Sequence, residues 1–197
     1  MFRHLLALGL LLQAGSILAD TLVGRVSGVS DGASLTVVDG ASVLHRIRLA
    51  AIDAPESRQP FSKESKQNLS DLVLGKEVRV EWRKHDRYGR IVGKLTLQAP
   101  PCSTCPKTQD AGLAQLEAGL AWWDRESRRE QSLADQGYYE YAEFDAKARR
   151  IGLWQDAAPM PPWEWRKKNQ VMACRVTARP PLTRGRNYGR KAPTEYS

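Results

Sequence analysis

The stretch Arg48-Leu49-Ala50-Ala51-Ile52-Asp53-Ala54-Pro55-Glu56 carries the strongest structural signal in this chain of 197 residues. Successive side chains of a strand point to opposite faces, so Arg48, Ala50 and Ile52 are expected on one face. The strand is expected to end at Asp53, because Asp and Pro favour turns. Such a turn brings Glu56 back toward Arg48, which predicts a site that combines a guanidinium with two carboxylates.

A second arginine follows in the turn Asp86-Arg87-Tyr88-Gly89-Arg90. Two guanidinium groups near a carboxylate suit phosphodiester hydrolysis, because arginines bind phosphate through paired hydrogen bonds and stabilise the charge of the transition state. The Glu56 carboxylate can orient or deprotonate the attacking water. The Asp53 carboxylate can hold a hard cation that bridges the phosphate oxygens.

The segments around this stretch alternate apolar and polar residues, which predicts strands. Turn signals at Ser30-Asp31-Gly32 and Asp39-Gly40 indicate an antiparallel meander of the first three strands. The segment from Ser62 to the stop signal Gly75 is typical of a helix. Five strands around one helix are consistent with a small closed barrel. The predicted strands are Leu22–Val29, Leu35–Val38, Val43–Ile52, Glu77–Trp82 and Ile91–Leu97.

Three motifs in this order resemble those of the staphylococcal nuclease (thermonuclease) family: Asp31-Gly32-Ala33-Ser34, Arg48 to Glu56, and Asp86 to Arg90. Gly119-Leu120-Ala121 and Gly152-Leu153-Trp154 extend the resemblance, which covers roughly residues 22–156. The resemblance implies an α+β fold, a five-stranded OB-type β-barrel with about three α-helices. It also implies calcium-assisted hydrolysis of single-stranded DNA or RNA. We expect the protein to be a monomer.

By motif position, the resemblance implies that Arg48 and Arg90 are the phosphate-binding arginines and that Glu56 is the general base. Asp53 would be a Ca²⁺ ligand, and Ala54 would offer the metal its backbone carbonyl. Two substrate-binding residues are expected beside them: Tyr88 near a bound base or phosphate, and Arg87 as a nonspecific phosphate contact.

One position departs from the family pattern. Ala33 stands where the family has an Asp that ligates the metal, and Ca²⁺ affinity rises with the number of charged ligands. Asp31 is a candidate replacement, either directly or through water. Two alternatives to a nuclease therefore stay open. The first is a catalytically impaired OB-fold protein that binds single-stranded nucleic acid, and the second is a structural or protein-interaction domain.

The composition agrees with a folded domain that binds a polyanion. Hydrophobic residues make up 42% and charged residues 26%, which argues against wholesale disorder. The formal net charge of +8 favours partners such as nucleic acid. The aromatic residues Trp122, Trp123, Tyr138, Tyr139 and Tyr141 either stack on unpaired bases or pack between helix and barrel, and packing is the more frequent use.

Residues 1–19 have the pattern of a secretory signal peptide, with a short positive start, the apolar run Leu5–Leu12 and a cut expected after Ala19. An uncleaved anchor is the alternative, although this run is short for a membrane span of about 20 residues. We therefore expect an exported protein, periplasmic or released, that has no membrane segment after cleavage.

The expected domain covers residues 20–166, with a Cys-containing insertion at about 99–109 and a flexible basic tail at 167–197. Helices are predicted at Ala111–Gly119 and Tyr138–Ile151, and the prolines after Ala158 predict an end to regular structure. Cys102, Cys105 and Cys174 are disulfide candidates in an exported chain, and the pairing stays open. Half of a zinc site is the alternative for the Cys102–Cys105 pair.

Overall fold

The computed structural model describes residues 19–99 and 106–177, with side chains up to residue 170. One compact unit ends at Pro162, and the residues from Trp163 onward form a second unit. The described residues of the second unit, 163–177, all belong to helix α4 (Pro162–Thr177), whose first residue is the last of the first unit. No described helix has the length and apolar character needed to cross a bilayer.

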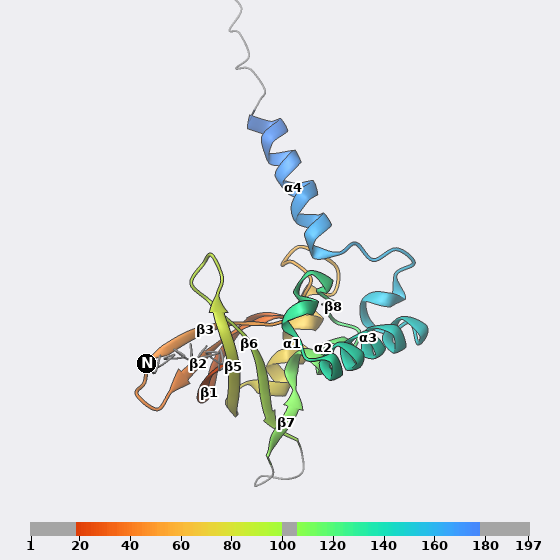
Figure 1. Ribbon diagram of the computed structural model, residues 1–197. Coiled ribbons are helices and arrows are strands. Elements are labelled where there is room, and N and C mark those ends of the chain that lie inside the picture. Colours follow the sequence, from red (N-terminus) through yellow and green to blue (C-terminus); the bar gives the residue numbers. More distant parts are fainter. Residues whose placement is uncertain (1–18, 100–105, 178–197) are drawn as a thin grey trace, which may run out of the picture. The chain divides into compact units, whose positions relative to one another are not determined.

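Five strands of the first unit close into a barrel (Figure 1). Antiparallel pairing gives the order β3-β2-β1-β5-β6, and a parallel pairing of β6 with β3 joins the two ends. This arrangement confirms the predicted five-stranded OB-type barrel with helices. The strands are β1 (Asp20–Asp31), β2 (Ser34–Asp39), β3 (Leu44–Leu49), β5 (Glu77–His85) and β6 (Ile91–Gln98).

The barrel interior is filled by the alternate apolar residues that the sequence pattern selects. In β6 the buried positions alternate strictly with partly exposed ones along the whole strand. Helix α1 (Ser62–Val73) closes the core with Leu69 and Val73, both fully buried. The inward-facing strand residues are Val26, Leu35, Val37, Ile47, Leu49, Val78, Val80, Ile91, Leu95 and Leu97.

Further elements pack around the barrel: β4 (Ile52–Asp53), β7 (Lys107–Asp110), α2 (Ala111–Glu117), β8 (Trp122–Trp123), the 3₁₀ helix η1 (Arg125–Glu130), α3 (Leu133–Ala148) and the 3₁₀ helix η2 (Gly152–Gln155). The Asp110 carboxylate caps α2 by accepting the Gly112 and Leu113 backbone N–H groups. The same carboxylate accepts the Tyr139 hydroxyl at 2.9 Å, which ties α3 to α2. Burial raises the pKa of the Tyr139 phenol far above its usual value, so this hydroxyl stays a donor.

Three local predictions were wrong. Helix α3 begins at Leu133 and not at Tyr138, because the Ser132 hydroxyl accepts the Asp135 N–H and caps the helix five residues earlier. The predicted strand Val43–Ile52 is interrupted, because β3 ends at Leu49 and Ala51 takes φ of +59° in a turn, so that Ile52 begins the separate strand β4. Regular structure also continues beyond Ala158, because α4 begins with Pro162 at a first helical position, where the missing N–H of proline costs nothing.

Some sequence predictions fall on residues that the structure does not describe. Residues 1–18 of the predicted signal peptide (1–19) lie outside the described residues. So do Cys102, Cys105 and residues 178–197 of the predicted basic tail. The side chain of Cys174 is not described either. Export and the cysteine chemistry therefore stay predictions.

Candidate active site

Arg48 projects from β3 and contacts the carboxylate predicted beside it. Its Nη2 donates to Asp53 Oδ1 at 3.0 Å and to the Ile52 carbonyl at 3.4 Å. The two-residue strand β4, which carries Asp53, is held in place by its antiparallel pairing with β8. The Asp53 side chain is nearly buried, with 7% exposed, whereas 24% of the Arg48 side chain is exposed. Arg48 therefore faces solvent with its charge partly compensated.

Arg90 is held by the turn that carries it. The Asp86 Oδ1 accepts the backbone N–H groups of Tyr88 and Arg90, and its Oδ2 accepts Arg90 Nε at 2.7 Å. The Arg90 Nη1 donates to the Ser34 hydroxyl at 3.1 Å. Burial alone would raise the pKa of the Asp86 carboxyl, but these hydrogen bonds outweigh it and hold the pKa below its usual value. At neutral pH Asp86 is therefore ionised and orients Arg90.

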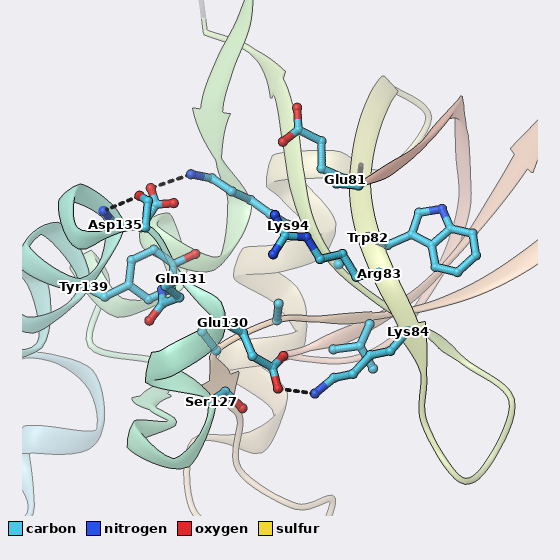
Figure 2. Close-up of a pocket in the computed structure, with 16 residues that line it drawn as sticks. Glu81, Trp82, Arg83, Lys84, Lys94, Ser127, Glu130, Gln131, Asp135 and Tyr139 are labelled. Carbon is cyan, nitrogen blue, oxygen red and sulfur yellow. Dashed lines mark hydrogen bonds and ion pairs between the residues drawn. The ribbon is translucent and has the colours of Figure 1, made fainter. Parts of the chain in front are cut away.

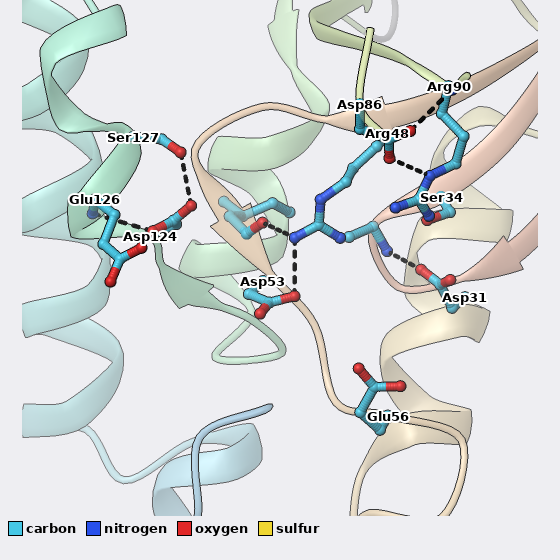
Figure 3. A network of polar contacts seen from close by, with 12 residues as sticks. Asp31, Ser34, Arg48, Asp53, Glu56, Asp86, Arg90, Asp124, Glu126 and Ser127 are labelled. Atoms are coloured by element: carbon cyan, nitrogen blue, oxygen red, sulfur yellow. Dashed lines mark hydrogen bonds and ion pairs between the residues drawn. The ribbon is translucent and has the colours of Figure 1, made fainter. Parts of the chain in front are cut away.

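The parallel pairing of β3 with β6 brings the two arginines together. Ile47 pairs with Ile91, and Arg48 pairs with Val92. Arg48 therefore follows Ile47 on β3, and Arg90 is the residue directly before β6, which begins at Ile91. Ser34 of β2 pairs with Arg48 and also accepts the bond from Arg90. Figure 3 shows both guanidinium groups in one network with Asp53, Asp86 and Ser34.

Glu56 lies in the loop after β4 and directs its carboxylate toward the part of the network bounded by Asp53 and Asp31 (Figure 3). The buried side chain of Gln59 fixes this loop. Its Oε1 accepts the Glu56 backbone N–H at 2.7 Å, and its Nε2 donates to the Met160 carbonyl at 2.9 Å. The Glu56 carbonyl in turn accepts the Gln59 N–H at 2.7 Å. One amide side chain thus fastens the candidate base to a segment about a hundred residues away.

Gln59→Leu is expected to remove both side-chain hydrogen bonds that hold this loop, while leucine keeps a similar size. The Glu56 N–H and the Met160 carbonyl would lose their partner, which costs about 1–3 kcal/mol of unfolding free energy. Cleavage should fall by about tenfold through kcat, since a misplaced base is a less effective one. Urea denaturation and steady-state kinetics measure the two effects. A Gln59→Leu protein with unchanged kcat would show that Glu56 holds its position without Gln59.

The segment Asp31–Ser34 forms the remaining wall of the site. The Asp31 Oδ1 accepts the Ala33 backbone N–H at 2.8 Å, and the Ala33 carbonyl accepts the Leu49 N–H at 2.8 Å. Ala33 is only 1% exposed and belongs to the apolar core cluster. The fully buried Gln115 donates to the Gly32 carbonyl at 2.6 Å and to the Ser65 carbonyl at 2.9 Å, which anchors this segment to α1 and α2.

The donors available to a cation are few. In the described part of the chain, no group of three or more His, Cys, Asp or Glu side chains could hold a metal ion. Asp53 supplies a buried carboxylate, and the buried Ala54 adds a backbone carbonyl. Ala33 offers no side-chain oxygen. This donor set fits a weakly held hard cation that takes its other ligands from substrate and water, and it does not fit a tight Ca²⁺ site.

The predicted substrate-binding residues lie at the edge of the site. Tyr88 is 58% exposed, and the guanidinium groups of Arg87 and Arg90 lie 4.9 Å and 5.6 Å from the centroid of its ring. Most of the other aromatic residues pack: Trp122, Trp123 and Tyr139 are at most 5% exposed. Tyr138 and Tyr141 are exposed at 62% and 68%, on α3.

Comparison with known proteins agrees with this geometry. The family model of the staphylococcal nuclease homologues matches residues 46–156, which contain most of the site. The chain belongs to the staphylococcal nuclease family. It is 36% identical over 149 residues to the micrococcal nuclease of Shigella flexneri. This alignment covers 75% of the present chain and 82% of the Shigella protein.

Two other similar proteins align over more of the chain. The protein ParB of Escherichia coli is 35% identical over 170 residues, covering 86% of this chain and 92% of ParB. An uncharacterized endonuclease of the same species is 32% identical over 166 residues, covering 84% of this chain and 99% of that protein. The resemblance expected from the sequence motifs is therefore confirmed.

The family motifs locate Arg48, Asp53, Glu56 and Arg90, and the structure places all four around one network. Three residues that position them were assigned no role from the sequence: Gln59, Gln115 and Asp86, although Asp86 begins the third motif. Asp86 had a local signal, since an Asp at the start of a tight turn commonly accepts backbone N–H groups two and four residues on. No local pattern marks the two glutamines, whose partners are distant in the sequence.

Proposed function

We propose that this protein hydrolyses phosphodiester bonds of single-stranded DNA or RNA at the site formed by Arg48, Arg90 and Glu56. As a member of the staphylococcal nuclease family the chain is a nuclease, a hydrolase that acts on nucleic acid. One observation carries the proposal: two arginines, each oriented by its own aspartate, meet at the pairing of β3 with β6. We also propose, from the first 19 residues, that the protein is exported.

The chain's own residues perform the chemistry as follows. A guanidinium has five N–H donors, so Arg48 and Arg90 keep donors for phosphate oxygens after their bonds to Asp53, Asp86 and Ser34. These donors stabilise the added negative charge of the pentacoordinate transition state. Glu56 orients the attacking water and accepts its proton.

Calcium dependence is general in the family, and we propose that a divalent cation is held here at Asp53 and the Ala54 carbonyl. Such a cation supplies Lewis-acid stabilisation of the phosphate oxygens when bound. Because Ala33 contributes no ligand, the affinity is expected to be lower than a two-carboxylate site would give.

The function is tested with Glu56→Gln, which removes the base and leaves the loop backbone unchanged. Purified mature protein is expected to cleave single-stranded DNA or RNA in the presence of Ca²⁺, Mg²⁺ or Mn²⁺. Glu56→Gln should lower kcat by about 10²- to 10⁴-fold, the range for loss of general base catalysis. Absence of cleavage that depends on Glu56 would refute the proposal. It would favour the alternative of a protein that binds single strands without turnover.

Ala33→Asp separates a functional weak-metal site from an impaired one. The new carboxylate would be buried at a position that is 1% exposed, so without Ca²⁺ the variant should be less stable by about 1–3 kcal/mol. With Ca²⁺ it should recover stability, since a ligand that binds only the folded state stabilises it. Calorimetric titration with a nucleotide bisphosphate present should show affinity higher by about 10- to 100-fold.

The control for this experiment is Ala146→Asp, which buries a carboxylate at a fully buried position of α3. It should lose stability without any recovery in Ca²⁺. If Ala33→Asp behaves in the same way, residue 33 does not face the cation.

A further inference from the structure

A cavity of about 260 Å³ lies on the barrel wall between strands β5 and β6 and the residues from η1 to the start of α3 (Figure 2). Its lining includes Ala50 and Ala51, which connect β3 to β4 and so join Arg48 to Asp53. Ser127 of η1 lines the cavity as well, and its hydroxyl is bonded to Asp124, whose backbone N–H donates to the Ala51 carbonyl. The cavity therefore adjoins the candidate active site through a shared turn.

The strand register also links the cavity to the two arginines. Ser34 pairs with Arg48, Arg48 pairs with Val92, and Val92 pairs with Lys84. Residues paired across strands lie on the same face of a sheet, and the residues on either side of Arg48 and Val92 are buried in the core. These four residues form a row across the outer face of the barrel. Adjacent strands lie about 4.8 Å apart, so Lys84 is roughly 10 Å from Arg48.

A β-bulge adds a second cation at the end of this row. The register of β5 with β6 shifts between Trp82 and Lys84, so that Arg83 is the additional residue. A bulge places two residues opposite one and redirects a side chain. Figure 2 shows the Arg83 and Lys84 side chains on the cavity side of β5, whereas the Trp82 ring points the other way.

The cavity is lined by three cationic and three anionic side chains, and two of the three cations form ion pairs within it. Lys84 pairs with Glu130, and Lys94 pairs with Asp135 at 2.5 Å. The Lys84–Glu130 pair is about half exposed, and such pairs contribute about 0–1 kcal/mol. Glu81 also lines the cavity, and it pairs with Arg79 outside it. Among the described residues, the Arg83 guanidinium has no hydrogen-bond or ion-pair partner.

We propose that this cavity is a subsite for the substrate nucleotide next to the scissile phosphate, whose own phosphate binds Arg83 and Lys84. The inference rests on the proposed function and specifies the path that the single-stranded nucleic acid takes over the barrel. A single-stranded nucleic acid that follows the row formed by Ser34, Arg48, Val92 and Lys84 places one phosphate at the two arginines of the active site. The adjoining nucleotide then lies at the cavity, where Ser127 and Gln131 offer polar groups to its base.

The experiment measures binding of fluorescently labelled dT8 by anisotropy in EDTA, where cation-assisted cleavage does not interfere. Arg83→Gln is expected to weaken binding by about 5- to 20-fold. It should also lower the slope of log Kd against log salt by about 0.7, the value for one phosphate contact on a single strand. Glu130→Gln should strengthen binding by about 2- to 5-fold, because it frees Lys84. The control Arg149→Gln removes the same charge from α3, away from the cavity, and should bind like the wild type.

A length comparison completes the test. With cation present, Arg83→Gln should lose more kcat/KM on dT8 than on the dinucleotide dT2, which has a single phosphate. Wild-type binding of dT8 with these variant effects but without cleavage would refute the nuclease proposal and support the subsite. Cleavage with Arg83→Gln and Glu130→Gln both matching Arg149→Gln would refute the subsite alone. Failure of the wild type to bind dT8 in EDTA would also refute the subsite.

Discussion

Arg90→Lys is expected to lower kcat by about 10³- to 10⁵-fold, the range for loss of an arginine that stabilises phosphoryl-transfer charge. Arg90 uses Nε for Asp86 and Nη1 for Ser34, so its planar group is fixed before substrate arrives. Lysine keeps the charge but has one nitrogen, which cannot bond two protein groups and a phosphate in the same fixed geometry. Steady-state kinetics on a single-stranded oligonucleotide measure the loss.

Stability should change little in this variant, because the Asp86 carboxylate still accepts the backbone N–H groups of Tyr88 and residue 90. Urea denaturation tests that expectation. The control is Arg79→Lys, an exposed arginine on β5 that pairs only with surface groups, and it should retain kcat. If Arg90→Lys also retains kcat within tenfold, Arg90 does not act on the transition state.

Gly152→Ala is expected to destabilise the protein by about 2–4 kcal/mol, the largest loss that we expect from adding a single methyl group. Gly152 has φ of +54° and faces Gly119, whose φ is +65°. A Cβ on Gly152 would lie 2.2 Å from the Gly119 carbonyl oxygen, a backbone atom that cannot rotate away. The Leu153 N–H donates to that same carbonyl at 2.8 Å, so the two glycines join the end of α2 to η2.

Gly137→Ala is the matched control, and it is expected to raise the free energy of unfolding, whereas Gly152→Ala lowers it. Gly137 is an exposed residue inside α3, and a Cβ there meets nothing within 4 Å. Alanine should stabilise the protein by about 0.5–1 kcal/mol, because glycine loses more backbone entropy in a helix. Equilibrium urea unfolding of both variants gives the comparison. Equal stability of Gly152→Ala and the wild type would contradict the close approach of the two glycines.

Local patterns in the sequence were sufficient for the barrel strands and for the motif residues. Alternation along β6 predicted its buried face because each residue contributes independently to the core. The strand that carries Arg48 was predicted to continue to Asp53, but β3 ends at Leu49. The sequence did not show that Ile52 and Asp53 form a separate strand, β4, which pairs with β8. The start of α3 was missed because the cap at Ser132 lies outside the apolar pattern on which the prediction depended.

The supporting contacts were not predictable, because their partners are remote in sequence. Gln59 and Met160 are separated by 101 residues, and Gln115 and Gly32 by 83. A glutamine that bonds a backbone carbonyl depends on where the chain runs and not on the type of its partner residue. The bulge at Arg83 could not be predicted from the sequence either, since an extra residue in a strand shifts the pairing register without changing the composition of the strand.

The parallel pairing of β3 with β6 has a consequence for when activity arises during folding. The meander β1–β2–β3 and the hairpin β5–β6 each form from neighbouring segments, and each brings only one of the two arginines. Joining them requires contacts between distant parts of the chain, which form slowly because the intervening loop must first be ordered. A chain with every strand formed but this last pairing open has all the side chains of the proposed site, but they are not yet assembled. The appearance of nuclease activity during refolding therefore reports closure of the barrel. Circular dichroism, which measures secondary structure, would change little at this step.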